Sequence, residues 1–276
     1  MKLKPLVING KQVKFPIIQG GMGIRISLNK LAAACMNSGI VATISAAQPG
    51  FLKKGFKKDP MKANKEAIKE EIDAARSENP DGVLGVNLMH AGNHFDEYAS
   101  FLATQNIDFI VSGAGLPLDL PEYIKDTKVK GAFIISSARA CRILLKSWDR
   151  RYSYMPEFIV CEGPLAGGHL GFSKEDFETG NVKSLEEIVE ETKEVVKVYE
   201  EKYKGVKVAS GIVLDNPAVF QKGELDMDFN RTDRYKTQGQ LDDAIDKLYD
   251  AFYTIERSDY ELSPQNIIKE FKGEAI

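Results

Sequence analysis

Residues 157–172 read "EFIVCEGPLAGGHLGF", and this stretch contains the pattern on which the fold depends. Residues 158–161 form an apolar run typical of a buried strand, and the turn after it brings together Glu162, a glycine pair and His169. Glycine lets a backbone approach another group more closely than a side chain would allow, so the pair Gly167-Gly168 predicts a close contact. A histidine beside that contact can act on whatever lies there.

Short apolar runs of this kind recur along the chain and alternate with longer segments of helical periodicity. The runs show no period-two polarity, which is typical of parallel strands covered on both faces. Their alternation with helices predicts a parallel α/β fold. Units of roughly 25–40 residues, without an early Rossmann glycine triad, favour a (β/α)8 TIM barrel over an open sheet. The expected strands are residues 17–18, 40–44, 83–88, 109–111, 132–135, 158–160 and 206–209.

Local sequence signals predict a hairpin and the starts of two helices. "LVINGKQVKF" (6–15) predicts a hairpin with Asn9-Gly10 at a type I′ turn. Asp59-Pro60 is a helix start signal, and Ser184 followed by Glu187 is a capping box before an apolar stripe at helical spacing.

The tail differs from the rest of the chain. Beyond Ile212 the sequence is polar and poor in strand signals, and "LDMDF" (225–229) is the single candidate for a final strand. The last part of the chain is expected to form amphipathic helices. We therefore expect a barrel with an incomplete or remodelled eighth strand in residues 1–223, followed by a divergent helical segment in residues 224–276.

Composition excludes several classes of protein. A formal charge of −3 and 43% hydrophobic residues argue against a dedicated nucleic-acid binder. No apolar stretch reaches the roughly 18–20 residues that cross a bilayer. Cys35, Cys141 and Cys161 are widely spaced and odd in number, which predicts a reduced, cytoplasmic protein rather than a disulfide framework. The sequence leaves open whether the chain forms a homo-oligomer.

The turns after four expected strands carry residues that are unusual for a core. If a barrel forms, these turns meet at one mouth, at the C-terminal ends of the strands. Glycine-lined amides there can hold a flat, anionic ligand. The residues are Gln19, Gly20, Gly21 and Met22, then Asn87, then Ser112, Gly113, Ala114 and Gly115, and finally Glu162, Gly167, Gly168 and His169.

His90 and His94 have the i, i+4 spacing that can hold a metal on a helix. No third ligand accompanies them, whereas a catalytic zinc normally has three protein ligands, so we expect no metal site. His90 can instead line the same mouth as a substrate contact.

Four ordered motifs resemble the nitronate monooxygenase family, which includes the enzymes once named 2-nitropropane dioxygenases and is related to FMN-dependent enoyl-ACP reductases. They are "PIIQGGMG" (16–23), "GVNLM" (85–89), "IVSGAGLP" (110–117) and "EGPLAGGHLGF" (162–172). The resemblance implies an FMN-binding TIM barrel with His169 as the catalytic histidine. Since His90 and Gly113 belong to the same mouth, we expect them to lie near the substrate. The implied cofactor-binding residues are Gln19, Gly20, Gly21, Met22, Asn87, Glu162, Gly167, Gly168, Ser210 and Gly211.

One part of the family pattern is missing. Members usually follow strand 7 with a Gly-Gly pair and end strand 8 with Gly-Thr-Arg-Phe, and these two turns hold the FMN phosphate. Here strand 7 ends Ala209-Ser210-Gly211, a partial match, and the second motif is absent. The expected consequences are a weakened phosphate site, a substitute for it from the tail, or loss of the flavin.

The leading hypothesis is an FMN-dependent oxidoreductase that oxidises alkyl nitronates, a small-molecule substrate, with O₂ as the electron acceptor. "SAAQPGFLKKGFKKDP" (45–60) and "WDRRYSYMPEF" (148–158) resemble the nitronate branch. An NAD(P)H-dependent enoyl-thioester reductase of the same fold is the first alternative. The second is a non-catalytic barrel paralogue that acts as a binding or scaffold protein, with an exposed barrel edge that a partner covers.

Overall fold

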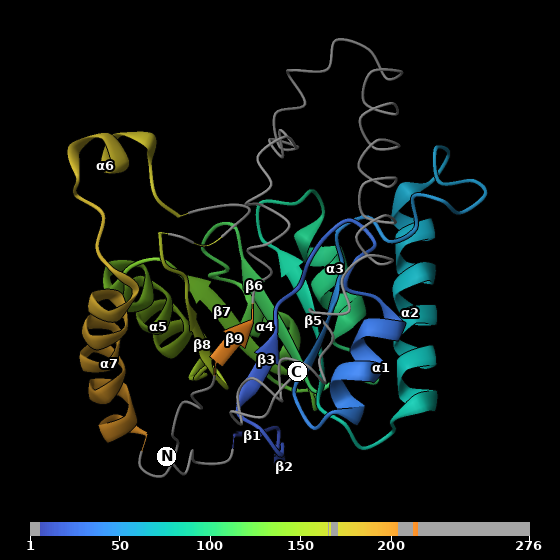
Figure 1. Ribbon diagram of the computed structural model, residues 1–276, viewed down its shortest axis with the longest axis horizontal. Helices are drawn as coiled ribbons and strands as arrows, with labels where there is room; N and C mark the ends of the chain where they lie inside the picture. Colours follow the sequence, from blue (N-terminus) through green and yellow to red (C-terminus); the bar gives the residue numbers. More distant parts are fainter. Residues whose placement is uncertain (1–5, 165, 167–170, 204–211, 215–276) are drawn as a thin grey trace, which may run out of the picture. The chain divides into compact units, whose positions relative to one another are not determined.

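The computed structural model describes residues 6–164, 166, 171–203 and 212–214 (Figure 1). The strands are β1 (Val7–Ile8), β2 (Lys11–Gln12), β3 (Ile17–Gln19), β4 (Ala42–Ser45), β5 (Leu84–Met89), β6 (Phe109–Gly113), β7 (Lys130–Ile135), β8 (Ile159–Cys161) and β9 (Ile212–Leu214). The helices are α1 (Asn29–Asn37), α2 (Pro60–Glu78), α3 (Phe95–Leu102), α4 (Leu120–Ile124), α5 (Ala138–Tyr152), α6 (Lys174–Thr179) and α7 (Leu185–Lys202).

All strands after the hairpin run parallel to their neighbours. Strands β4 to β8 form one sheet in chain order. Strand β3 lies beside β4, since Ile18 bridges to Val41 and the Gln19 amide donates to the Val41 carbonyl at 2.9 Å. Strand β9 pairs with the other edge of β3, with Ile17 opposite Ile212. The predicted parallel α/β architecture is confirmed, and the described strands follow the order β9-β3-β4-β5-β6-β7-β8.

One face of this sheet points into an apolar cluster. Gly85 leaves room for the Phe109 ring, because a Cβ at residue 85 would lie 2.2 Å from it. The ring in turn meets Phe158 edge to face at a centroid distance of 5.0 Å, although β7 lies between their strands. The sheet therefore curves around its core. The cluster consists of Leu6, Ile8, Val13, Ile18, Val41, Val83, Phe109, Val111, Ala132 and Phe158, with Ile134 and Val160 packed against it.

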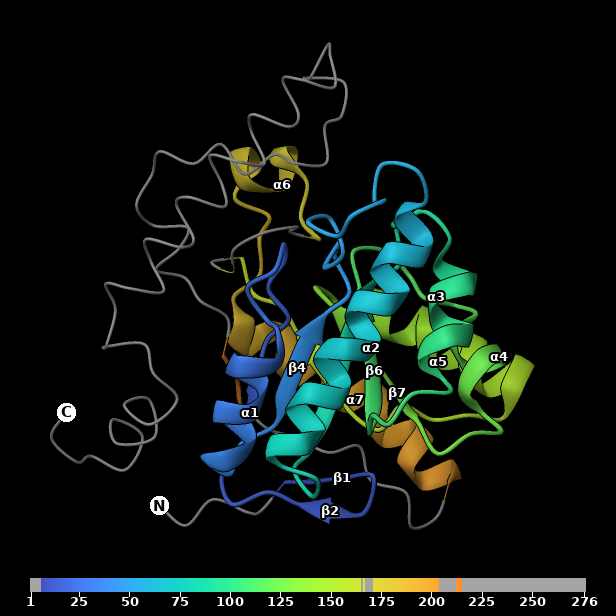
Figure 2. The same cartoon turned by 90° about the vertical axis from the view of Figure 1, so that its right-hand side faces the viewer.

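Helices cover the opposite face of the sheet (Figure 2). The fully buried Trp148 of α5 meets Phe133 of β7 edge to face at 5.1 Å, and its indole Nε1 donates to the Pro117 carbonyl at 2.9 Å. The helix signals of the sequence are confirmed at two starts. Asp59 caps α2 by accepting from the Lys62 amide at 3.0 Å, and Ser184 with Glu187 forms the capping box of α7.

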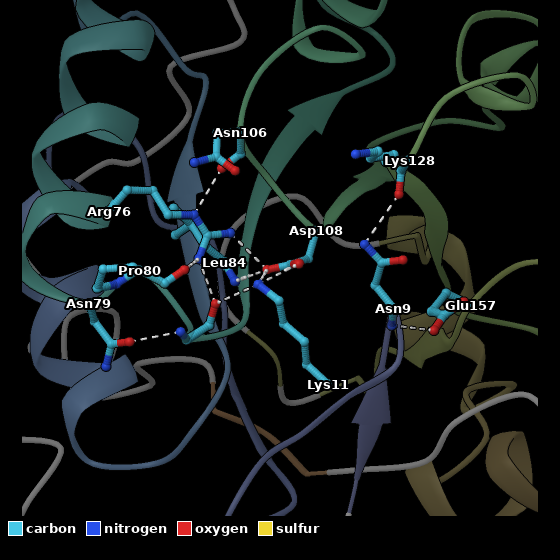
Figure 3. Close-up of polar contacts among 11 residues, drawn as sticks. Asn9, Lys11, Arg76, Asn79, Pro80, Leu84, Asn106, Asp108, Lys128 and Glu157 are labelled. Atoms are coloured by element: carbon cyan, nitrogen blue, oxygen red, sulfur yellow. Dashed lines mark hydrogen bonds and ion pairs between the residues drawn. The ribbon is translucent and has the colours of Figure 1, made fainter.

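The predicted hairpin is confirmed as well, and it covers the N-terminal ends of the strands, here called the closed end (Figure 1). Asn9 and Gly10 both have positive φ angles, 50° and 75°, as a type I′ turn requires. The Asn9 amide donates to a Glu157 carboxylate oxygen at 2.6 Å, and its side chain donates to the Lys128 carbonyl at 3.2 Å (Figure 3). The hairpin is thereby attached to the segments that enter β7 and β8.

A buried carboxylate connects the hairpin to the helices at the same end (Figure 3). Asp108, 3% exposed, accepts from the Leu84 amide at 2.9 Å and pairs with Lys11 of β2 at 2.9 Å. It also pairs with Arg76 of α2 at 2.8 Å. The Arg76 guanidinium, itself 7% exposed as a residue, donates to the carbonyls of Asn106, Pro80 and Gly82. Every charge in this group therefore has a partner, as buried charges require.

Some expectations fall beyond the described residues and remain predictions: the strands at 206–209 and 225–229, and the helical segment at 224–276. Strand β9 was not predicted, because Ile212 was placed at the start of the polar tail. Its pairing with β3 is a long-range contact that a local pattern does not contain. No helix in the described part of the chain is long and apolar enough to span a bilayer.

Candidate functional site

The C-terminal ends of strands β3 to β8 and the connections that follow them form the mouth. Alternate residues of a strand point to the same face, so the inward positions can be counted from the core cluster in steps of two. Along β5 they run from Val83 through Gly85 to Asn87, and along β8 from Phe158 to Glu162. The inner face changes from apolar to polar toward the mouth, where the inward positions are Ser45, Asn87, Gly113, Ser136 and Glu162.

Asn87 and Gly21 lie against each other at the centre of the predicted flavin site. A Cβ at Gly21 would be 2.3 Å from the Asn87 Cβ, so only a bare backbone fits there. The Asn87 carbonyl accepts from the Ala46 amide at 3.0 Å, but its half-buried side-chain amide has no hydrogen-bond partner within the described residues. It keeps two donors and one acceptor for a ligand.

Gln19 was expected to touch the flavin, and that contact remains a prediction. The side chain is 5% exposed. Its Oε1 accepts from the Thr43 amide at 2.9 Å, and its Nε2 donates to the Ser27 hydroxyl at 2.9 Å. The Ser27 hydroxyl also accepts from the Met22 amide at 2.9 Å. Gln19 therefore fixes the turn at Gly20 to Met22 against β4.

Glu162 joins two connections at the mouth. Its Oε2 accepts from the Ser136 hydroxyl at 3.0 Å and from the Gly171 amide at 3.2 Å. A Cβ at Gly171 would lie 2.2 Å from the Ser136 Oγ, so glycine is required for this approach. The carboxylate thus holds together the segments that follow β7 and β8. Ser136 was not singled out from the sequence, although the two-residue period from Ala132 places it at the mouth.

His90 lies at the rim of the mouth between β5 and β6, next to Gly113, the other predicted substrate contact. Its amide donates to the Gly113 carbonyl at 2.8 Å, and its ring meets Phe95 edge to face at 4.7 Å. The ring Nδ1 is buried without a hydrogen-bond partner in the described structure. Burial lowers the pKa of His90 below 6.5, and the nearby Asp119 carboxylate opposes this in part. The ring is thereby biased toward the neutral form.

His94 does not share a helix face with His90, since it is the N-cap of α3 with a left-handed φ of 62°. Its Nδ1 lies 3.1 Å from a Glu97 carboxylate oxygen. No group of three potential metal ligands occurs among the described residues.

Strained backbone is concentrated at the mouth. The connections after β3, β4, β5 and β6 each contain one residue other than glycine in the left-handed region: Arg25 (62°), Gln48 (45°), His94 (62°) and Ala114 (52°). Such residues cost about 1–2 kcal/mol each and tend to occur at functional sites. Arg25 was not among the predicted site residues, although an arginine directly after a glycine-rich turn was visible in the sequence.

The remaining predicted site residues lie outside the described residues. They are the catalytic candidate His169, its neighbours Gly167 and Gly168, and the phosphate-turn candidates Ser210 and Gly211.

A family model described as nitronate monooxygenase matches residues 4–200. Because the match spans well over half of the chain, the chain belongs to the nitronate monooxygenase family, as its motifs predicted. No curated protein sequence gives a significant match.

Two solved structures are among those that resemble this chain, and the first of them, with a TM-score above 0.5, supports the same type of fold. Nitroalkane oxidase from Streptomyces ansochromogenes matches with a TM-score of 0.52 at 16% identity, covering 66% of this chain and 56% of that one. FabK from Thermotoga maritima matches with a TM-score of 0.46 at 21% identity, covering 58% of this chain and 44% of that one. The similarity thus extends over about half the length of these proteins.

Proposed function

We propose that this protein is a flavin-dependent oxidoreductase that binds FMN at the mouth and oxidises alkyl nitronates with O₂. Membership of the nitronate monooxygenase family supports the class of reaction. The observation that carries the site is the Asn87 side-chain amide, which has no partner among the described residues, beside the bare backbone of Gly21. A ligand with a flat face and polar edges satisfies both.

The described residues fit a flavin in three respects. Gly21, which is half-buried, leaves bare backbone at the mouth, where a Cβ would lie 2.3 Å from the Asn87 Cβ. Asn87 offers hydrogen bonds to a polar ring edge or ribityl chain. The apolar core below, including Val111 and Ile134, closes the inner side of the mouth against water.

Within this proposal the residues have separate tasks. His169 abstracts the α-proton of a neutral nitroalkane or orients a bound nitronate, for which an imidazole titrating near neutral pH is suited. Glu162 supports the segment beyond His169, since its carboxylate accepts from the amide of Gly171. His90 and Gly113 line the substrate side of the mouth. FMN supplies the transfer of electrons from substrate to O₂.

We include a reducing, cytoplasmic location in the proposal, because Cys35, Cys141 and Cys161 are free thiols in the structure.

The first experiment is the visible absorption spectrum of the purified protein before and after addition of FMN and desalting. Flavin bands that survive desalting support the proposal, and a protein that retains no FMN contradicts it. Anaerobic addition of ethyl nitronate or of NADPH then separates the reactions. Bleaching of the bands by the nitronate supports nitronate oxidation, whereas bleaching by NADPH alone indicates the enoyl-thioester reductase.

The role of His169 has its own test. His169→Ala is expected to abolish oxidation of neutral nitroethane while FMN stays bound. His94→Ala, an exposed histidine at the start of α3, serves as the control. If His169→Ala oxidises both nitroethane and its nitronate at the wild-type rate, His169 has no part in the chemistry.

A further inference from the structure

The connection between β3 and α1 holds an arginine, Arg25, whose hydrogen-bonding capacity is largely unused within the described residues. Arg25 is half-buried, and its NH1 donates one hydrogen bond, to the Pro49 carbonyl at 2.6 Å. Within the described part of the chain no carboxylate lies at ion-pair distance from it. Since a guanidinium carries five N–H donors, most of its hydrogen-bonding capacity is unused.

The backbone at this position argues against a purely structural role. Arg25 has a left-handed φ of 62°, where glycine is the residue that folding alone favours. The connection around it is nevertheless rigid. The Ser27 amide donates to the Met22 carbonyl at 3.1 Å, and the Ser45 amide donates to the Ser27 carbonyl at 2.9 Å. Arg25 is therefore a fixed cation in a strained position.

Its surroundings place this cation at the rim of the mouth. A Cβ at Gly23 would lie 2.8 Å from the Ala47 Cβ, so the connection that bears Arg25 rests directly on the end of β4. Pro49, its hydrogen-bond partner, belongs to the connection between β4 and α2. Figures 1 and 2 show this connection at the same end of the sheet as α6.

The same connection adds positive charge. Residues 53–58 read "KKGFKK", and Lys54 and Lys58 are exposed. Neither of these two has an ion-pair partner among the residues that the structure describes. Clustered charge of one sign raises the local concentration of oppositely charged ligands. The connection that bonds Arg25 through Pro49 therefore also carries two exposed lysines.

We propose that Arg25 binds an oxyanion of the ligand, either the phosphate of FMN or an acidic group on the substrate. This inference rests on the proposed function and adds to it an anion site after β3, far in sequence from the phosphate turns that the family resemblance implies. A guanidinium suits phosphate and carboxylate, because its paired donors match two oxygens of either group.

Arg25→Gly is the sharpest variant, since glycine adopts the left-handed conformation without strain and the fold should be preserved. Arg25→Lys keeps the charge and loses the planar donor pair. Arg150→Gln removes one positive charge from an exposed position in the last turn of α5 and is the control. Arg25→Gly is expected to unfold at the wild-type temperature or somewhat above it, because glycine removes the left-handed strain, and the other two variants are expected to match the wild type.

Two pairs of ligands, each differing by one anionic group, distinguish the cofactor phosphate from an acidic group on the substrate. Dissociation constants for FMN and riboflavin come from quenching of flavin fluorescence, and KM values are compared for the nitronates of 1-nitrobutane and 4-nitrobutanoate. If Arg25 holds the cofactor phosphate, Arg25→Gly weakens FMN about tenfold or more and leaves riboflavin unchanged. If Arg25 instead binds the substrate, Arg25→Gly raises KM about tenfold or more for the nitronate of 4-nitrobutanoate and leaves KM for the nitronate of 1-nitrobutane unchanged.

The inference would be overturned if Arg25→Gly changed the dissociation constants of FMN and riboflavin equally and also changed KM for the two nitronates equally. It would also be overturned if none of these constants changed. A wild type that retains no flavin would contradict the proposed function instead. The anion site is then tested with inorganic phosphate at constant ionic strength. Thermal stabilisation by phosphate relative to chloride, lost in Arg25→Gly but kept in Arg150→Gln, would support it, and equal behaviour of the three proteins would refute it.

Discussion

Both ends of the parallel sheet contain polar residues bonded within the protein, and the mouth also contains polar groups without such bonds among the residues described. At the closed end Asp108 receives two ion pairs and a backbone amide, and Arg76 donates to three carbonyls (Figure 3). At the mouth the Asn87 amide has no partner and the His90 Nδ1 is buried without one, among the residues described. The Arg25 side chain makes one hydrogen bond within the part of the chain that the structure describes.

This difference separates stability from function within one fold. Polar groups that are saturated by the protein stabilise it but have nothing left for a ligand. Unsaturated groups and strained connections cost folding free energy, and they persist where binding requires them. Substitutions at the closed end are therefore expected to change unfolding, and substitutions at the mouth to change binding.

The largest effect is expected at the closed end. Asp108→Asn leaves the buried Arg76 without its counter-charge, and breaking such a pair costs about 3–5 kcal/mol in the free energy of unfolding. Urea unfolding followed by circular dichroism measures this. Asp73→Asn removes the exposed pair with Lys69 and should cost well under about 1 kcal/mol. Similar losses in both variants would contradict the importance assigned to the closed end.

Two glycine substitutions test the same contrast. Gly85→Ala places a methyl group 2.2 Å from the buried Phe109 ring, and overpacking of this kind costs about 1–3 kcal/mol. Gly21→Ala places one 2.3 Å from the Asn87 Cβ, which is fixed to β5, so overpacking lowers stability there as well and displaces the Asn87 amide. We expect lower stability for both variants in urea unfolding, and weaker FMN binding for Gly21→Ala alone. Equal loss of FMN binding in the two variants would contradict the distinction between the two ends.

Asn87→Ala extends the test to a polar group. No protein hydrogen bond is lost, so the unfolding free energy should change by less than about 0.5 kcal/mol. FMN affinity should fall about tenfold, as fluorescence quenching would show. Asn64→Ala is the matched control. Asn64 is 4% exposed and bonds the Gly50 amide and the Tyr98 hydroxyl, both at 2.9 Å, so stability should fall while FMN affinity is kept.

Local signals were sufficient where the structure depends on neighbours in sequence. The hairpin at Asn9-Gly10, the caps at Asp59 and Ser184, and the parallel strands all followed from spacing and turn chemistry. Strand β9 did not, because its partner β3 is nearly 200 residues away in sequence. At the site, Asn87 and Gly21 were identified from their positions after strands, and the structure places them in contact. The unused capacity of Arg25 and the Ser136–Glu162 bond depend on tertiary packing.

The smallest expected effect is a change in the pH dependence of stability at His90. Its sign shows whether the ring is mainly desolvated or mainly paired with a carboxylate. Burial holds the pKa of His90 in the folded protein below 6.5, more strongly than Asp119 raises it. Between the unfolded value, near 6.5, and the lower folded value, the unfolded chain binds more protons, so folding loses stability as pH falls through this window. His90→Gln should lack this loss, and urea unfolding between pH 7.5 and 5 measures the difference. If the unfolding free energies of the wild type and His90→Gln depend on pH in the same way, burial of His90 has no measurable effect on its pKa. A wild type that gains stability relative to His90→Gln in acid would mean that Asp119 dominates, and His90 would then belong with the saturated ion pairs of the closed end.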